Sequence, residues 1–262
     1  MDHQEVGRIW DSNADAWTRL ARAGYDVYRD HLNTPAFLAM LPDVSGLAGL
    51  DIGCGEGHNT RLVAGRGASM TAVDVSARFI GHAREAEAAE PLGIRYLTAS
   101  AVELPFPDGS FDFCMATMSL MDVPEQDDAL AEAHRVLRPG GFLQFSICHP
   151  CFMTPRWSWV TGDDGERIGV VCGDYFDPEQ GRVEEWIFGA APPEAREGVE
   201  KFKVPTFFRT LEWWLNTVVE TGFRLERVQE PTADDETAAK CPDVADTKIV
   251  AYFLHVRCRK PE

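Results

Sequence analysis

Apolar positions along the chain fall into short runs of β-branched and aromatic residues, separated by longer stretches rich in Ala, Glu and Arg. The short runs predict seven strands, at residues 47–52, 70–73, 94–97, 111–116, 142–147, 223–229 and 249–258. The longer stretches predict helices at residues 59–65, 76–90, 126–137 and 210–221, the second with Ser76 as its N-cap. Because strands that alternate with helices are typical of βαβ units, we expect an α/β fold with a parallel sheet.

Two segments interrupt this alternation. Residues 1–45 precede the first strand and predict an N-terminal helical cap across one end of the sheet. Residues 150–208 follow the fifth strand, and they are far more than the roughly 2–6 residues usual in such a connection. We therefore expect a core of residues 46–149 and 209–262, with residues 150–208 as an insert that acts as a lid. Residues 191–198 and 231–243 are rich in Pro, Gly or charge and predict surface loops.

Aromatic residues are concentrated in the insert and just after it. Five of the seven tryptophans lie there: Trp157, Trp159, Trp186, Trp213 and Trp214. Two interpretations stay open at this point. The rings form a small core of their own, or they form the wall of a site for an aromatic or apolar ligand.

Composition limits the possible partners. The net charge of −17 would repel a phosphate backbone, so we expect no nucleic-acid partner. No run of about 18 apolar residues predicts a membrane span, and the start "MDHQEVG" lacks the features of a secretory signal, which favours a cytoplasmic protein. The seven cysteines are scattered and favour reduced thiols over disulfides, and the lone C-x-x-C of "CHPC" predicts no metal site because no second ligand pair accompanies it.

Three glycines mark the point where the first strand should become a helix. The stretch "LDIGCGEGHNTRLVA", residues 50–64, places Gly53, Gly55 and Gly57 at every second position. Residues without Cβ allow a sharp turn and let a ligand approach bare backbone. Dinucleotide-binding proteins use the related spacing G-x-G-x-x-G, but here the spacing is G-x-G-x-G and Asp51 precedes it. A carboxylate there suits a ligand with ammonium and sulfonium groups, and Asp74 at the end of the next strand can accept hydrogen bonds from ribose hydroxyls.

Together with three later segments, this loop resembles the class I S-adenosylmethionine-dependent methyltransferases, particularly the small-molecule subgroup that includes quinone-type methylases. The segments are "VDVS", "LPFPDGSFDFCMATMSLMDVPE" and "EAHRVLRPGGFLQFSI", in the family's order, over residues 47–147. The resemblance implies a Rossmann-like, doubly wound, seven-stranded sheet with helices on both faces. It also implies S-adenosylmethionine as cofactor, with S-adenosylhomocysteine as product.

The resemblance also implies roles for particular residues. The loop residues and Asp74 would hold the methionine and ribose, Val75 and Val102 would enclose the adenine, and Thr117 would lie near the methionine. Ser100 stands where the family often has an Asp that binds the adenine, which puts that contact in doubt. The expected cofactor-binding set is Asp51, Gly53, Cys54, Gly55, Gly57, Asp74, Val75, Ser100, Ala101, Val102 and Thr117.

One histidine is a candidate general base. His149 follows the fifth strand, at the carboxyl edge of the sheet where ligands of such folds bind, and imidazole titrates near neutrality. The alternative is that His149, which precedes Pro150, is a turn residue bonded to backbone.

These observations predict an enzyme that methylates an O, C or N atom of a small aromatic or apolar acceptor, working as a monomer or homodimer. The chain has "ATMSLMD" where methylases of amino groups in nucleobases and glutamine carry an "NPPY"-like sequence, which argues against those substrates. Two alternatives remain open: a non-catalytic binding module on the same fold, and an NAD-dependent oxidoreductase.

Overall fold

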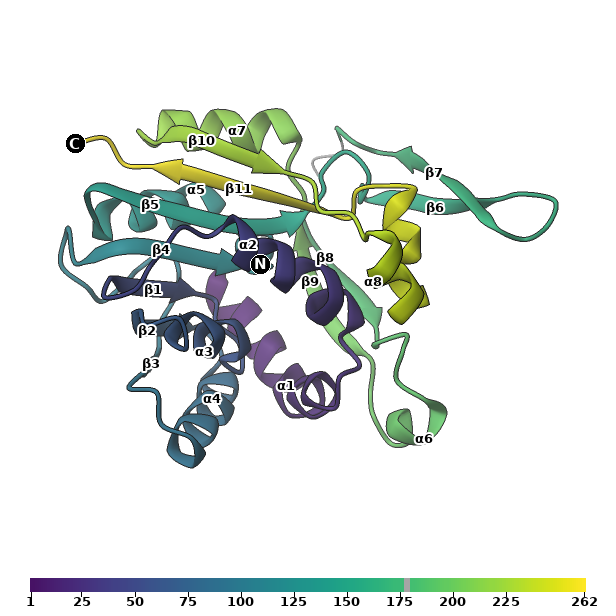
Figure 1. Cartoon of the computed structure of the whole chain (residues 1–262), viewed down its shortest axis with the longest axis horizontal. Helices are drawn as coiled ribbons and strands as arrows, with labels where there is room; N and C mark the ends of the chain where they lie inside the picture. Colours follow the sequence, from purple (N-terminus) through teal and green to yellow (C-terminus); the bar gives the residue numbers. More distant parts are fainter. Residues whose placement is uncertain (177–179) are drawn as a thin grey trace.

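A mixed sheet runs through the computed structural model, which describes residues 1–176 and 180–262 (Figure 1). The strand order is β10-β11-β5-β4-β1-β2-β3. These strands are β1 (Ala48–Ile52), β2 (Ser69–Asp74), β3 (Arg95–Thr98), β4 (Phe111–Thr117), β5 (Leu137–Cys148), β10 (Arg224–Gln229) and β11 (Phe253–Arg259). All pairs from β3 to β5 are parallel, whereas β11 runs antiparallel to both β5 and β10. The predicted mostly parallel, seven-stranded sheet is confirmed.

Helices cover both faces of this sheet (Figure 1). On one face, α5 (Gln126–Val136) and α7 (Leu211–Glu220) bury apolar side chains against β1, β4, β5 and β11. On the other face, α3 (His58–Ala64) and α4 (Ala77–Ala89) pack against β2 and β4. The Ser76 hydroxyl accepts a hydrogen bond from the Phe79 amide at 3.2 Å, which confirms the predicted N-cap of α4. No helix of the described residues is long and apolar enough to cross a bilayer.

The N-terminal segment forms α1 (His3–Arg22), a π-helical turn η1 (Arg29–Asn33) and α2 (Thr34–Met40). α2 packs on the same face as α3 and α4, where Phe37 is fully buried. α1 contacts α4 on one side and a strand of the insert on the other. The first 40 residues therefore join the sheet layer to the insert.

The insert is built from two antiparallel hairpins. One pairs β6 (Arg156–Thr161) with β7 (Arg167–Gly173) and projects away from the sheet (Figure 1). The other pairs β8 (Gln180–Trp186) with β9 (Phe202–Phe207) and lies beside α1. Trp17 of α1 packs against Phe188 and Phe202 with ring centroids 4.9 and 4.8 Å away. Part of the insert's aromatic content is therefore a core shared with the N-terminal helix.

Three sequence predictions near the C-terminal half were wrong. The expected loop at 231–243 contains α8 (Asp235–Lys240) and the start of the 3-10 helix η3 (Pro242–Lys248), and the expected loop at 191–198 contains α6 (Pro193–Arg196). The Asp234 carboxylate caps α8 by accepting a hydrogen bond from the Thr237 amide at 2.8 Å, and Val244 is fully buried. The last strand begins at Phe253 instead of residue 249, because η3 extends to Lys248.

Candidate active site

A cavity of about 1120 Å³ lies at the carboxyl ends of the parallel strands β1, β2 and β4. Its walls come from the glycine loop after β1, from α1 and η1, from the β8–β9 hairpin and from η3 with the start of β11. Cavities that hold one small ligand typically measure about 300–1,000 Å³. This cavity therefore has room for a cofactor and a second small molecule.

The glycine loop presents bare backbone to the cavity. Gly55 has a φ of +55°, and a Cβ placed on it would meet no atom within 4 Å. Gly53 has a φ of +74°, and a Cβ there would lie 2.3 Å from the Ser119 Cβ. Gly53 and Cys54 also border the cavity. The glycine at 53 is thus required by packing, whereas the glycine at 55 leaves open space.

The third glycine has a different role. Gly57 is the residue before α3 and has a φ of +88°, and a Cβ on it would lie 2.6 Å from the Tyr96 hydroxyl. It does not border the cavity. Its place in the sequence motif reflects the tight turn into α3 against β3.

Asp74, at the end of β2, borders the cavity and is held by backbone donors. Its Oδ2 accepts from the Gly55 amide at 2.8 Å, and its Oδ1 accepts from the Ser76 amide at 2.8 Å. Burial raises the pKa of this carboxyl to about 6, partly offset by those two hydrogen bonds. The structure therefore places a fixed acceptor where the sequence predicted one for ribose hydroxyls.

Asp51 is fully buried and does not border the cavity. Its Oδ2 accepts from the Thr60 hydroxyl at 2.6 Å, and its Oδ1 has no partner in the described part of the chain. Burial raises the pKa of the Asp51 carboxyl to about 7. The hydrogen bond to Thr60 links β1 to α3 behind the glycine loop, so Asp51 stabilises this loop from outside the cavity.

The predicted adenine-binding residues are only partly brought together. Val75, Ser100 and Ala101 border the cavity, but Val102 does not. The Ser100 hydroxyl accepts a hydrogen bond from the Val102 amide at 3.4 Å. The cavity wall here also includes Phe79 of α4 and, from α1, Val6 and Trp10. The two α1 residues were not predicted because α1 is distant in the sequence.

The opposite side of the glycine loop carries charged residues from the N-terminal segment. Arg29 lies 2.7 Å from Asp30 and 3.3 Å from Glu56, measured between nitrogen and oxygen atoms. Asp26 also borders the cavity, and burial raises the pKa of its carboxyl to about 6. Sequence analysis missed these residues, because only the folded η1 brings residue 29 next to residue 56.

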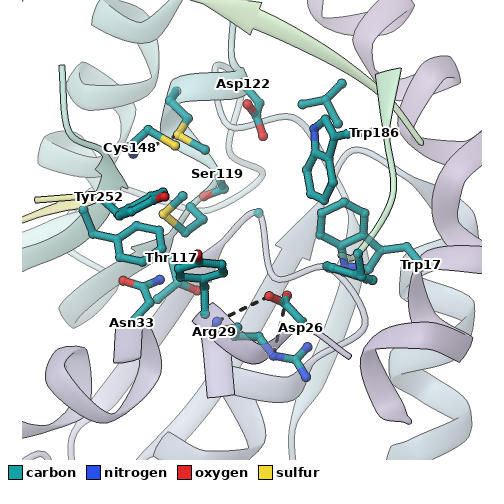
Figure 2. Close-up of a pocket in the computed structure, with 18 of the residues that line it drawn as sticks. Trp17, Asp26, Arg29, Asn33, Thr117, Ser119, Asp122, Cys148, Trp186 and Tyr252 are labelled. Carbon is teal, nitrogen blue, oxygen red and sulfur yellow. Dashed lines mark hydrogen bonds and ion pairs between the residues drawn. The ribbon is translucent and has the colours of Figure 1, made fainter. Parts of the chain in front are cut away.

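The ends of β4 and β5 form the centre of the cavity (Figure 2). Thr117 borders it, and its hydroxyl accepts a hydrogen bond from the Asn59 amide group at 2.9 Å. Figure 2 shows Thr117 and Ser119 between Asp26 on one side and Asp122 on the other. Asp122 ends the 3-10 helix η2 (Leu120–Asp122) and was not predicted.

The structure does not bring His149 to this cavity. Its side chain is almost completely buried, with Nε2 2.7 Å from Glu230 Oε1. Its Nδ1 accepts a hydrogen bond from the Cys151 amide at 3.2 Å. Both ring nitrogens are engaged, which corresponds to the alternative of a turn residue bonded to backbone.

Comparisons with known proteins place this geometry in a family. A family model described as "Methyltransferase domain" matches residues 50–145. The chain is 30% identical to 27-O-demethylrifamycin SV methyltransferase of Amycolatopsis mediterranei, over 98% of this chain and 97% of that protein. A solved S-adenosylmethionine-dependent methyltransferase from Mesorhizobium loti is 30% identical, with a TM-score of 0.70 over 86% of this chain and 96% of that one.

The chain belongs to the S-adenosylmethionine-dependent methyltransferases. Coverage of other relatives is partial. Malonyl-[acyl-carrier protein] O-methyltransferase of Pectobacterium atrosepticum is 36% identical over 135 residues, which is 51% of either protein.

The described residues fit the family's cofactor. S-adenosylmethionine carries hydroxyls and a sulfonium cation, and the cavity offers the fixed Asp74 carboxylate beside the open backbone at Gly55. Larger side chains at Gly55 would fill the space that this backbone leaves free. In the described part of the chain, no three His, Cys, Asp or Glu side chains come together as a metal site would require.

Proposed function

We propose that this protein transfers the methyl group of S-adenosylmethionine to a small molecule with an apolar or aromatic body. The observation that carries this proposal is the shape of the cavity, which extends from the glycine loop into a chamber with apolar walls. Beyond Thr117 these walls are formed by Met118, Met121, Cys148, Trp186, Tyr252 and Phe253. The chamber begins where the cofactor site ends, so an acceptor there would lie next to the cofactor.

For the cofactor, we propose roles for the residues that border the cavity. Asp74 accepts hydrogen bonds from the ribose, the backbone of residues 53–55 contacts the methionine, and Val75, Ser100 and Ala101 contact the adenine. Asp51, Gly57 and Val102 act from outside the cavity by holding this backbone in place. When bound, S-adenosylmethionine supplies an electrophilic methyl group on a positively charged sulfur.

For the acceptor, the protein must fix its orientation and exclude water. One end of the chamber is closed by a network around Asp246, whose carboxylate accepts from the Tyr28 and Tyr252 hydroxyls, each at 2.9 Å. Arg167 of β7 completes this network at 2.5 Å from Asp246. We propose that residues 1–45 and the insert 150–208 together form the acceptor site, because this network joins them to the core residues 209–262.

The relatives' names support the apolar acceptor. One is the methyltransferase of 27-O-demethylrifamycin SV, and another is a fatty-acid O-methyltransferase of Mycolicibacterium smegmatis, 32% identical over 168 residues. Both names refer to methylation at oxygen, and a fatty acid has an apolar chain. An O–H acceptor is therefore the first class to test.

Calorimetry with S-adenosylmethionine and S-adenosylhomocysteine, followed by methyl transfer to a panel of apolar alcohols, phenols and carboxylic acids, tests the proposal. We expect saturable binding of both compounds and S-adenosylhomocysteine production that depends on the acceptor. Absence of binding by folded, ligand-free protein would overturn the proposal. Binding without turnover on the whole panel would instead favour a non-catalytic module.

We also propose that the protein acts in the cytoplasm as a monomer or homodimer, without a nucleic-acid substrate. The seven free thiols and the net charge of −17 support this view. Light scattering of the purified protein measures the oligomeric state.

A further inference from the structure

Asp122 differs from the other buried carboxyl groups of the cavity. It is 8% exposed and borders the cavity from the end of η2. Glu56 is paired with Arg22 and Arg29, and Asp74 accepts two backbone hydrogen bonds. In the described part of the chain the Asp122 carboxyl has no hydrogen bond or ion pair, and only burial and two like charges act on it.

The surroundings of Asp122 are apolar on the acceptor side of the cavity. In Figure 2 its carboxyl group points into the cavity, with Cys148 on one side and Trp186 on the other. Met121, Val123 and Pro124, its neighbours in sequence, also border the cavity. A buried carboxyl without a protein partner is costly unless it is neutral or bonded to a ligand.

The charges around Asp122 are negative. Burial raises its pKa well above the usual range, and the carboxylates of Asp74 in β2 and Glu184 in β8 raise it further. From β5, the group that faces it is the Cys148 thiol, whose own pKa is raised to about 12. The strand β9 and helix α5 also pack against η2, but Lys203, Asp127 and Asp128 on these elements do not border the cavity.

We propose that Asp122 is the group that takes the proton from the methyl acceptor, which therefore presents an O–H or N–H group to it. This inference rests on the proposed function and adds a substrate class to it. Asp122 lies beyond Thr117 and Ser119, in the chamber proposed for the methyl acceptor. An O–H or N–H group of a molecule bound there can donate a hydrogen bond to the unpaired Asp122 carboxyl.

The step balances in atoms and charge. The acceptor's O–H bond breaks and its proton passes to the Asp122 carboxylate. The electron pair of the acceptor oxygen forms the new O–CH₃ bond, and the electrons of the old C–S bond stay on sulfur. One cation and one anion thus become two neutral groups, so the apolar chamber favours the products.

The charge of Asp122 must then differ between the cofactor-free protein and the protein with S-adenosylmethionine bound. The neutral form is favoured in the cofactor-free protein, because among the described residues only burial and the negative charges of Asp74 and Glu184 shift the pKa of Asp122. A sulfonium bound in the same cavity favours the ionised form, which is the form that can act as a base. S-adenosylhomocysteine has no such charge, so it leaves the carboxyl neutral.

Isothermal titration calorimetry in two buffers of different ionisation enthalpy at pH 7 measures this difference without any acceptor. We expect the wild-type protein to release more protons on binding S-adenosylmethionine than on binding S-adenosylhomocysteine, by on the order of one proton per protein. The difference should vanish in Asp122→Asn. The variant Glu184→Gln is the matched control, since it removes a neighbouring carboxylate that does not border the cavity, and it should retain the difference.

The outcomes separate this inference from the proposed function. Loss of binding of both compounds by the wild-type protein would refute the methyltransferase proposal itself. Normal binding with the same proton difference in Asp122→Asn, or with no difference in wild type, would overturn the role of Asp122. If Asp122→Asn fails to bind S-adenosylhomocysteine, Asp122→Glu replaces it, and that variant should keep the proton release.

Discussion

The carboxylate of Asp74 and the amide of Gly55 are joined by a hydrogen bond of 2.8 Å. Asp74 is the last residue of β2, and Gly55 lies in the loop that follows the neighbouring parallel strand β1. This bond fixes the carboxylate against the glycine loop, so the acceptor that we propose for ribose hydroxyls is held next to the bare backbone. Substitutions in the loop can therefore be compared by their effects on cofactor binding and on the stability of the fold.

Replacing Gly55 with Asp should abolish cofactor binding while the fold survives. The new Cβ meets no protein atom within 4 Å, and Asp tolerates a φ of +55° better than most residues. The side chain would occupy the space left for the cofactor. We expect the Kd for S-adenosylhomocysteine to rise at least about 100-fold, a loss of roughly 3 kcal/mol in binding free energy. The positive φ should lower the melting temperature, but by less than a clash in the packed part of the loop would. Calorimetry and thermal unfolding measure the two effects.

Gly53→Ala is the contrasting variant. Its Cβ would lie 2.3 Å from the Ser119 Cβ, so the loop or η2 must shift. We expect a fall in melting temperature together with weaker binding. If Gly55→Asp unfolds the protein as strongly as Gly53→Ala, the loop at residue 55 has a packing role that the structure does not show.

Asp51→Asn should change how stability depends on pH. Burial raises the pKa of Asp51 to about 7 in the folded protein, whereas an Asp in an unfolded chain has a pKa of about 3.9. Between these two pH values the folded protein therefore holds a proton that the unfolded chain has lost. Its contribution to stability is therefore complete below pH 4 and is lost as pH rises to 7, at about 1.4 kcal/mol per pH unit. The variant lacks this dependence.

Urea unfolding at pH 5, 6, 7 and 8 tests this expectation. The stability of Asp51→Asn relative to wild type should increase from pH 5 to 7 and then level off. Thr60 can still donate to the amide oxygen of the new side chain, so its contact with Oδ2 is preserved. A relative stability that is constant with pH would show that the Asp51 carboxyl is ionised in the folded protein.

The sequence predicted the sheet and the glycine loop because both follow from local chemistry. The central strands β4 and β5 contain apolar runs that are buried in the core, and Gly53 must lack a Cβ because Ser119 packs against it. Asp122 and Arg29 could not be predicted as cavity residues, because their neighbours in space come from segments far away in the sequence. The loop prediction at 231–243 failed for a related reason: Val244 anchors this polar segment by tertiary burial, which composition does not reveal.

His149→Ala should reduce stability without removing a catalytic base. The substitution deletes the contact with Glu230 and leaves the Cys151 amide without its acceptor. The void left by the imidazole ring, together with the lost hydrogen bonds, should lower the unfolding free energy by about 2–4 kcal/mol. Glu230→Gln is a milder control, since that side chain is 56% exposed and keeps an acceptor. A stable variant that loses the pH dependence of methyl transfer would restore His149 as the base.

Trp186→Ala should weaken acceptor binding more than cofactor binding. The ring borders the chamber opposite Cys148 and keeps 37% of its surface exposed, so its removal enlarges the acceptor site. We expect the acceptor KM to rise about 10-fold or more, while the Kd for S-adenosylhomocysteine changes little, because a buried aromatic contact is worth on the order of 1.4 kcal/mol or more. Steady-state kinetics with an acceptor from the panel, together with calorimetry, give both numbers.

Two other aromatic residues of the insert serve as controls for Trp186. Phe202 is 1% exposed and does not border the cavity, so Phe202→Ala should lower the unfolding free energy by about 3–5 kcal/mol through lost packing against Trp17. Trp157 of β6 is 36% exposed and also lies outside the cavity, so its truncation should change neither constant. Suppose that in Trp186→Ala the acceptor KM and the Kd for S-adenosylhomocysteine rise equally, and that the unfolding free energy falls as it does in Phe202→Ala. Trp186 would then support the core of the hairpin and would not select the acceptor.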